Sequence, residues 1–230
     1  MIFLLKLKRW TRCLFVLPAV LSLSGLAVRA QERVGYDTAA AGFSLSDKNP
    51  GAPASDPFSK GNFELEFLGG GDSSTVFPDA RHPRITFVGA DLRFGLMVSN
   101  ITGRGFYRGN FEILLGAFAA GVTDGPGSWL AGGCVLGRYN FVQPKARVVP
   151  YLQLAGGGLG NDVYRDHTQR LIGGGFEFTL GAGVGVRFPI GRHFGLLLEG
   201  SYLHISDAGI YPRNRGLNTF GAHAGGFYLF

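Results

Sequence analysis

The feature that most constrains the fold is a strict alternation of residue types between Phe176 and Phe188. Every second residue in this run is apolar, and the residues between them are Glu177, Thr179, three glycines and Arg187. A period of two is typical of a β-strand whose two faces meet different surroundings. The run also exceeds the about 9–11 residues with which a tilted strand crosses a bilayer.

Similar runs recur through the chain, and no helical period competes with them after residue 60. Phe63, Leu65 and Phe67 alternate with Glu64 and Glu66 in the first run, and the fourth and fifth runs alternate less cleanly. Eight strands are predicted, an even number that is typical of bacterial membrane barrels. The expected strands are residues 61–70, 83–99, 105–120, 128–142, 146–158, 174–189, 192–206 and 217–230.

Alternation alone would also suit a soluble sandwich, and three features favour a membrane barrel instead. Many runs are long enough to span a bilayer. Their polar face mixes acids, bases and glycine, which suits the crowded interior of a small barrel. The chain ends FYLF, with Tyr228 and Phe230 on one face, and this resembles the assembly signal of bacterial outer-membrane barrels. We therefore predict an all-β fold, an eight-stranded antiparallel transmembrane β-barrel over residues 61–230.

The connections are expected to alternate in length, with both termini on the periplasmic side. Short turns are predicted at residues 100–105, 143–145 and 190–192. Longer outer loops, rich in Gly, Asp, Asn and Pro, are predicted near residues 71–82, 121–127, 159–173 and 207–216.

The N-terminus has the pattern of a secretory signal peptide. Four basic residues precede the apolar run Cys13–Val28, and Val28-Arg29-Ala30 offers a cleavage site, so residues 1–30 are predicted to be removed. Residues 31–60 are predicted to form a flexible segment. Removal of residues 1–30 takes five of the 22 basic residues and none of the 16 acidic ones, which leaves a net charge of +1. A chain of that charge gives no basis for nucleic-acid binding.

Charged residues on the inward parity of the strands are expected to pair with one another. An eight-stranded barrel is filled by side chains and leaves no aqueous channel, which argues against a porin. The predicted ion-pair network comprises Glu64, Glu66, Asp91, Arg93, Arg108, Glu112, Arg187 and Glu199.

His204 and Ser206 end the seventh predicted strand. Because Glu199 is assigned to the interior, parity places His204 and Ser206 together on the lipid-facing side, near the outer-leaflet interface. Periodicity alone allows two interpretations, namely a catalytic pair or polar residues that border the apolar band.

The motif around these residues is similar to that of a known family. Tyr202-x-His204-x-Ser206-Asp207-Ala208-Gly209, followed by Asn214-x-Gly216-Leu217-Asn218, resembles the C-terminal motif of the lipid A deacylases, the acyloxyacyl hydrolase-like outer-membrane barrels. The segments GRYNF (137–141), PYLQLAGG (150–157) and FTLGAGVGVRF (178–188) resemble that family as well. The resemblance covers residues 61–230. It implies a serine esterase in the outer membrane that removes an ester-linked acyl chain from lipid A, with its active site at the outer leaflet.

The resemblance also assigns roles to residues. It implies Ser206 as nucleophile and His204 as general base, with no cofactor or metal, and lipopolysaccharide and outer-membrane lipids as partners. Family members with a complete triad have Glu where this chain has Asn218, and an Asn can orient an imidazole without offsetting its charge. Asp207 stands where the family has Asn, which together with the backbone of Ala208 and Gly209 is implied to support the oxyanion.

The two departures leave open what this chain does. A charged Asp207 would either oppose a developing oxyanion or support His204. The alternative to an esterase is a catalytically silent barrel with a structural or surface-adhesion role. A homodimer also remains open, because nothing in the sequence decides the oligomeric state.

Overall fold

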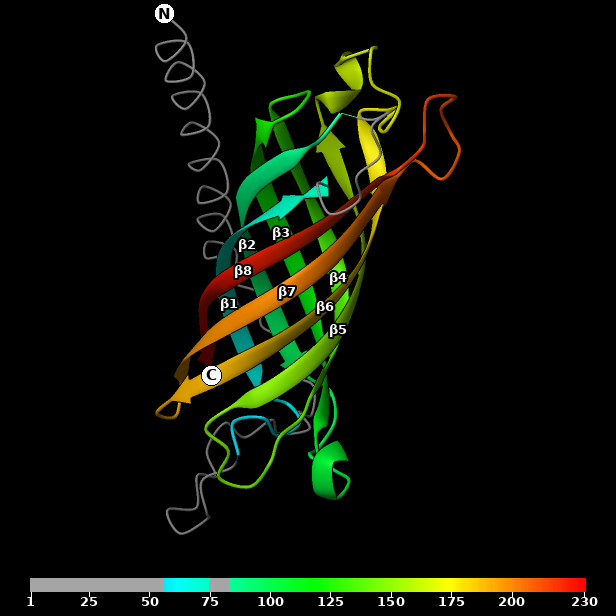
Figure 1. The fold of residues 1–230 in the computed structure, drawn as a ribbon. Helices are drawn as coiled ribbons and strands as arrows, with labels where there is room; N and C mark the ends of the chain where they lie inside the picture. Colours follow the sequence, from blue (N-terminus) through cyan, green and yellow to red (C-terminus); the bar gives the residue numbers. More distant parts are fainter. Residues whose placement is uncertain (1–55, 75–82) are drawn as a thin grey trace, which may run out of the picture. The chain divides into compact units, whose positions relative to one another are not determined.

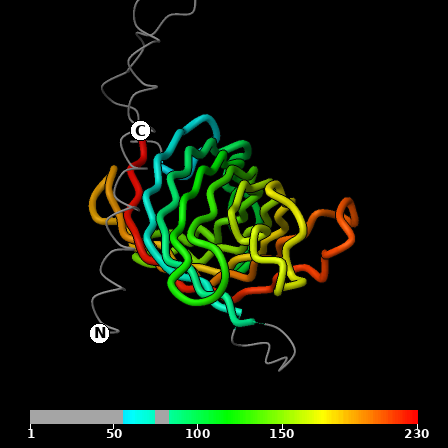
Figure 2. The backbone as a smooth tube through the Cα atoms, turned by 90° about the horizontal axis from the view of Figure 1, so that it is seen from above, coloured from blue at the N-terminus to red at the C-terminus, as the bar shows by residue number. Residues whose placement is uncertain are grey.

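A computed structural model describes residues 56–74 and 83–230. Its eight strands form one closed antiparallel barrel in sequence order (Figures 1 and 2). The strands are β1 (Phe63–Ser73), β2 (Thr86–Met97), β3 (Asn110–Asp124), β4 (Trp129–Asn140), β5 (Val149–Asn161), β6 (Phe176–Ile190), β7 (Phe194–Ser206) and β8 (Leu217–Leu229).

Pairing of β1 with β8 closes the barrel, with Leu65 opposite Tyr228 and Ser73 opposite Phe220. Closure satisfies the strand N–H and C=O groups between neighbours and leaves no free edge, as a sheet surrounded by lipid requires. The predicted fold class is thereby confirmed. No helix within residues 56–74 and 83–230 is long and apolar enough to cross a membrane.

The outward face of the barrel is apolar, as the alternation predicts. In β6, Leu180 and Val184 are exposed, whereas Glu177 and Arg187 are fully buried in the interior. In β7, Leu196 and Leu198 are exposed and Glu199 is buried. An exposed apolar band of this kind is suited to lipid and unsuited to water.

The interior is filled by ion pairs in its middle. Arg138 donates two hydrogen bonds to the Glu66 carboxylate, at 2.6 and 2.8 Å, and Arg93 binds Glu199 in the same bidentate way, at 2.8 and 3.0 Å. Arg187 pairs with Glu64. Removal of one partner from such a buried pair leaves an uncompensated charge, so these pairs depend on one another.

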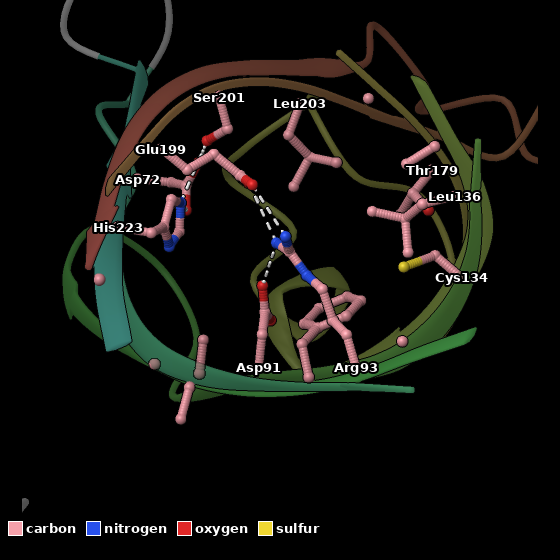
Figure 3. A pocket seen from close by; sticks show the side chains of 18 of the residues that line it. Asp72, Asp91, Arg93, Cys134, Leu136, Thr179, Glu199, Ser201, Leu203 and His223 are labelled. Atoms are coloured by element: carbon pink, nitrogen blue, oxygen red, sulfur yellow. Dashed lines mark hydrogen bonds and ion pairs between the residues drawn. The ribbon is translucent and has the colours of Figure 1, made fainter. Parts of the chain in front are cut away.

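Apolar clusters fill both ends of the barrel. We call the end that holds the start of β1 and the end of β8 the terminal end, and the opposite one the loop end (Figure 1). The terminal-end cluster includes Phe58, Leu197 and Phe227, and the loop-end cluster includes Ile172, Ile205 and Leu217. Between them lies a cavity of about 110 Å³ that Asp72, Arg93, Glu199 and His223 line (Figure 3).

The connections at the terminal end are longer than expected in two places. The turn predicted at residues 143–145 lies within a longer connection, residues 141–148. The turn predicted at residues 100–105 is part of a longer connection, residues 98–109, which contains the 3₁₀ helix η3 (Gly105–Tyr107). Phe106 and Tyr107 give this connection an apolar sequence, but Phe106 stacks on Phe141 instead of continuing a strand. Arg108, predicted in the interior network, donates to the Val142 carbonyl at the terminal end, so that assignment was wrong.

The predicted N-terminal segments are only partly visible. The signal peptide and residues 31–55 lie outside the described residues. Residues 56–60 precede the predicted barrel start, and Phe58 is buried there. The Phe58 carbonyl accepts a hydrogen bond of 2.7 Å from Asn110 Nδ2, so the described part of this segment packs against the barrel.

Candidate active site

His204 and Ser206 lie on the same outward face at the loop end of β7. His204 Nε2 is 3.1 Å from Ser206 Oγ. Both side chains are half-buried, and their neighbours across the β6–β7 pairing are the exposed apolar residues Leu180 and Phe178. A nucleophile and a base within hydrogen-bond distance therefore face the apolar surroundings of the barrel.

Asn218 approaches the imidazole from β8. The β7–β8 register places it directly opposite His204, and its Oδ1 lies 2.8 Å from His204 Nδ1. Because an amide oxygen only accepts hydrogen bonds, His204 Nδ1 carries the proton and donates it. His204 Nε2 is then unprotonated and accepts the hydrogen bond of the Ser206 hydroxyl, which is the arrangement that a general base requires.

Gly216 provides the space in which the imidazole lies. A Cβ at this position would stand 2.9 Å from His204 Cε1, and the Gly216 φ of +76° is one that L-residues rarely adopt. A glycine is therefore required here for both a conformational and a steric reason.

The Asp207 side chain turns inward and does not face the imidazole. It is fully buried, and its carboxylate accepts hydrogen bonds from the N–H groups of Gly209, at 2.8 Å, and Tyr211, at 3.0 Å. Asn214 Nδ2 also donates to it. Asp207 thus organises the start of the β7–β8 connection, residues 207–216.

The same turn determines which backbone N–H groups are available beside Ser206. The Gly209 N–H is donated to Asp207, whereas within the described residues nothing accepts the N–H of the exposed Ala208. Ala208 has a φ of +56°, so the turn holds it in the left-handed region. The Ala208 N–H is therefore a candidate oxyanion donor in the Asp207–Gly209 segment.

The β5–β6 and β7–β8 connections support each other at the loop end. Arg213 donates to the carbonyls of Tyr164 and Asp166, and the Gly216 N–H donates to the Leu171 carbonyl at 3.0 Å. The Thr168 hydroxyl and N–H both donate to Asp166 and lower the pKa of that carboxyl. The connection that holds Gly216 against His204 is thus braced by a neighbouring loop.

A second serine–histidine pair lies inside the barrel. Ser201 Oγ is 3.1 Å from His223 Nε2, and Asp72 Oδ2 is 3.3 Å from the same nitrogen (Figure 3). The two pairs have similar distances but opposite surroundings, since these three residues line the internal cavity. Among the described residues, no cluster of three or more His, Cys, Asp or Glu side chains could hold a metal ion.

The family assignment rests on the sequence from β2 to β8. The family model described as lipid A 3-O-deacylase (PagL) matches residues 90–226, more than half of the chain. The chain belongs to the PagL family. The matched residues include Ser206, His204 and Asn218, and membership makes this barrel an outer-membrane protein.

Solved structures similar to this PagL-family chain are also barrels. The outer membrane enzyme PagL has 16% sequence identity, covers 71% of this chain and 97% of its own, and gives a TM-score of 0.48. Neisserial surface protein A has 14% sequence identity, covers 73% of this chain and 94% of its own, and gives a TM-score of 0.46. The N-terminal β-barrel domain of OprF from Pseudomonas aeruginosa has 14% sequence identity, covers 74% of this chain and 98% of its own, and gives a TM-score of 0.43. A search of curated proteins found no match.

Two features of the site were not predicted from the sequence. Tyr202 belongs to the motif, but its hydrogen bond to Asn218 Oδ1, at 2.7 Å, depends on cross-strand register. Gly216 also belongs to the motif, and its proximity to His204 depends on the path of the connection. A glycine two residues before the facing Asn218 was the available signal for the second feature.

Proposed function

We propose that this PagL-family barrel is a serine esterase that removes an ester-linked acyl chain from lipid A, with Ser206 as nucleophile and His204 as general base. The observation that carries the proposal is the 3.1 Å contact between His204 Nε2 and Ser206 Oγ on the outward face, where Asn218 anchors the other imidazole nitrogen. A serine–histidine pair on the outward face is not needed to pack the buried core. A water-soluble substrate would also have no reason to approach a pair that faces lipid.

The first half of the reaction acylates the enzyme. Ser206 Oγ attacks the ester carbonyl carbon while its proton passes to His204 Nε2. The Ala208 N–H stabilises the negative oxygen of the tetrahedral intermediate. When the intermediate collapses, the bond between the carbonyl carbon and the sugar oxygen breaks, and the imidazolium returns its proton to that oxygen.

The second half releases the fatty acid. A water molecule transfers a proton to His204 Nε2 and attacks the acyl-serine carbonyl, and the new intermediate expels Ser206 Oγ, which regains the proton. The imidazolium formed in each half donates from Nδ1 to Asn218 Oδ1. Asn218 holds the ring in place but brings no negative charge, so a lower rate is expected than with a carboxylate there.

The location of the site suits a membrane lipid. Phe178 and Leu180 flank Ser206 and His204 on β6, and both are exposed on the lipid-facing surface. An acyl chain of a lipid in the same leaflet lies against such a surface without leaving its apolar surroundings. We place the loop end at the outer leaflet, where lipopolysaccharide resides, and the family description names the 3-O ester as the bond that is cut.

Mass spectrometry of lipid A from cells with and without the protein tests this function. We expect the native chain to produce lipid A that lacks one ester-linked acyl chain. Ser206→Ala should restore the intact mass, since a small half-buried hydroxyl at a strand end contributes little to packing.

Ser201→Ala is the matched control because it removes the hydroxyl of the internal serine–histidine pair. It should leave deacylation unchanged. If the native protein, inserted and folded, leaves lipid A intact, the esterase proposal fails and the catalytically silent barrel replaces it.

A further inference from the structure

Tyr202 contacts the proposed catalytic residues without belonging to them. It lies two residues before His204 on β7, and its hydroxyl donates to Asn218 Oδ1 at 2.7 Å. The same oxygen accepts the hydrogen bond from His204 Nδ1 at 2.8 Å. Phe220, the β8 neighbour of Tyr202, lies against its ring with the centroids 5.4 Å apart.

A neutral amide at position 218 can present either its oxygen or its NH₂ group to His204, whereas a carboxylate presents an oxygen in both orientations. With its oxygen toward His204, Asn218 keeps the imidazole proton on Nδ1 and leaves Nε2 able to accept from Ser206. With its NH₂ group toward His204, the amide would donate to Nδ1, and the imidazole proton would move to Nε2. A base in that second tautomer cannot take the Ser206 proton.

The Tyr202 hydroxyl favours the first orientation. A phenol is a stronger donor than acceptor, because the lone pairs of its oxygen are partly delocalised into the ring. It donates to Asn218 when the amide oxygen faces it, and it would have to accept from Nδ2 if the amide turned over. The hydroxyl and the imidazole N–H thus hold one carbonyl oxygen between them, and that oxygen has lone pairs for both.

We infer that Tyr202 is a positioning residue, which keeps Asn218 with its oxygen toward His204 and thereby keeps the imidazole in the competent tautomer. Its catalytic consequence rests on the proposed esterase function, whereas its effect on the tautomer does not. A carboxylate at position 218 would accept at either oxygen and would not need this control.

Tyr202→Phe tests the inference, because it removes the hydroxyl and leaves the ring against Phe220. We expect kcat for lipid A deacylation to fall about two- to tenfold, the range for loss of one hydrogen bond, with KM unchanged. In an Asn218→Asp background the same substitution should lower kcat less than about twofold. Tyr228→Phe, which changes another outward tyrosine near the terminal end, is the control and should alter neither constant.

Nitrogen-15 NMR of the His204 imidazole in detergent gives a readout that does not need turnover. The native protein should show the Nδ1–H tautomer, and Tyr202→Phe should show a mixture with the Nε2–H form. An unchanged tautomer, or an equal loss of kcat in both backgrounds, would overturn the inference and leave the esterase proposal intact. A shifted tautomer in a barrel that never deacylates lipid A would support the positioning role and reject the esterase.

Discussion

Asn218 lies directly opposite His204 in the β7–β8 register, with its Oδ1 2.8 Å from His204 Nδ1. Since strand pairing fixes this position, a carboxylate introduced there would meet the same nitrogen. We expect Asn218→Glu and the isosteric Asn218→Asp to raise kcat by about tenfold, because each adds a charge that stabilises the imidazolium. Fatty-acid release from lipid A measures the effect. A folded Asn218→Asp protein that is slower than the native one would contradict this account of the imidazole.

Gly216 should be required for the position of the imidazole. In Gly216→Ala the new Cβ would stand 2.9 Å from His204 Cε1, so the ring or the connection must shift. A displacement of about 1 Å can cost about a hundredfold in rate, and we expect a loss of tenfold or more in kcat.

Gly191→Ala is the control for backbone strain at Gly216. Gly191 has the same φ of +76°, but nothing lies within 4 Å of a Cβ there. Its activity should stay within about twofold of native. Equal losses in the two variants would mean that strain, and not contact with His204, explains the effect.

Asp207→Asn should lower deacylation and not raise it. The Asp207 carboxylate faces inward and accepts from the Gly209 and Tyr211 N–H groups, so its charge is used within the connection. An amide can accept at only one of its two ends, and the turn that holds Ala208 should loosen. We expect kcat to fall by about tenfold or more, on the order of the loss of one charged hydrogen bond of about 1.5–3 kcal/mol.

The comparison variant for Asp207 is Asp166→Asn, an acidic residue of the neighbouring connection that binds Thr168. Its kcat should remain close to native. If Asp207→Asn instead accelerates release of fatty acid, the native carboxylate opposes the oxyanion. Our interpretation that its charge is used within the connection would then be wrong.

Two adjacent residues of β6 test which face of the barrel meets lipid. Leu180 is 63% exposed and Thr179 is 4% exposed. Single cysteines at these positions, in a Cys134→Ala background, should respond differently to a lipid-soluble thiol reagent, which should label position 180 and spare position 179. The reverse labelling pattern would mean that the faces are assigned wrongly and that His204 and Ser206 point into the interior.

Much of the fold follows from period-two alternation, because a barrel wall is one residue thick and each side chain faces either lipid or core. The alternation of β6 predicted that Leu180 would be exposed and Glu177 buried, as they are. Arg138 was missed as the centre of the ion-pair network because the glycines of β4 obscure its parity. The apolar sequence at Phe106 and Tyr107 predicted a strand where η3 forms, since ring stacking on Phe141 has no periodic signature.

The sequence predicted only the strand face on which the site lies and the motif to which its residues belong. Placing His204 and Ser206 on one face needs only their spacing, and the structure has them there with Asn218 beside them. Which atoms meet depends on the shear between β7 and β8 and on the turn after Ser206. The Tyr202 hydroxyl bond and the inward turn of Asp207 arise from that geometry and have no counterpart in the sequence pattern.

The most direct test of the esterase is fatty-acid release from lipid A by the purified barrel in detergent. We expect the native protein to release one acyl chain per lipid A, Ser206→Ala and His204→Ala to release none above background, and Ser201→Ala to match the native rate. Release by a folded Ser206→Ala protein at the native rate, or no release by the folded native protein, would contradict the esterase proposal.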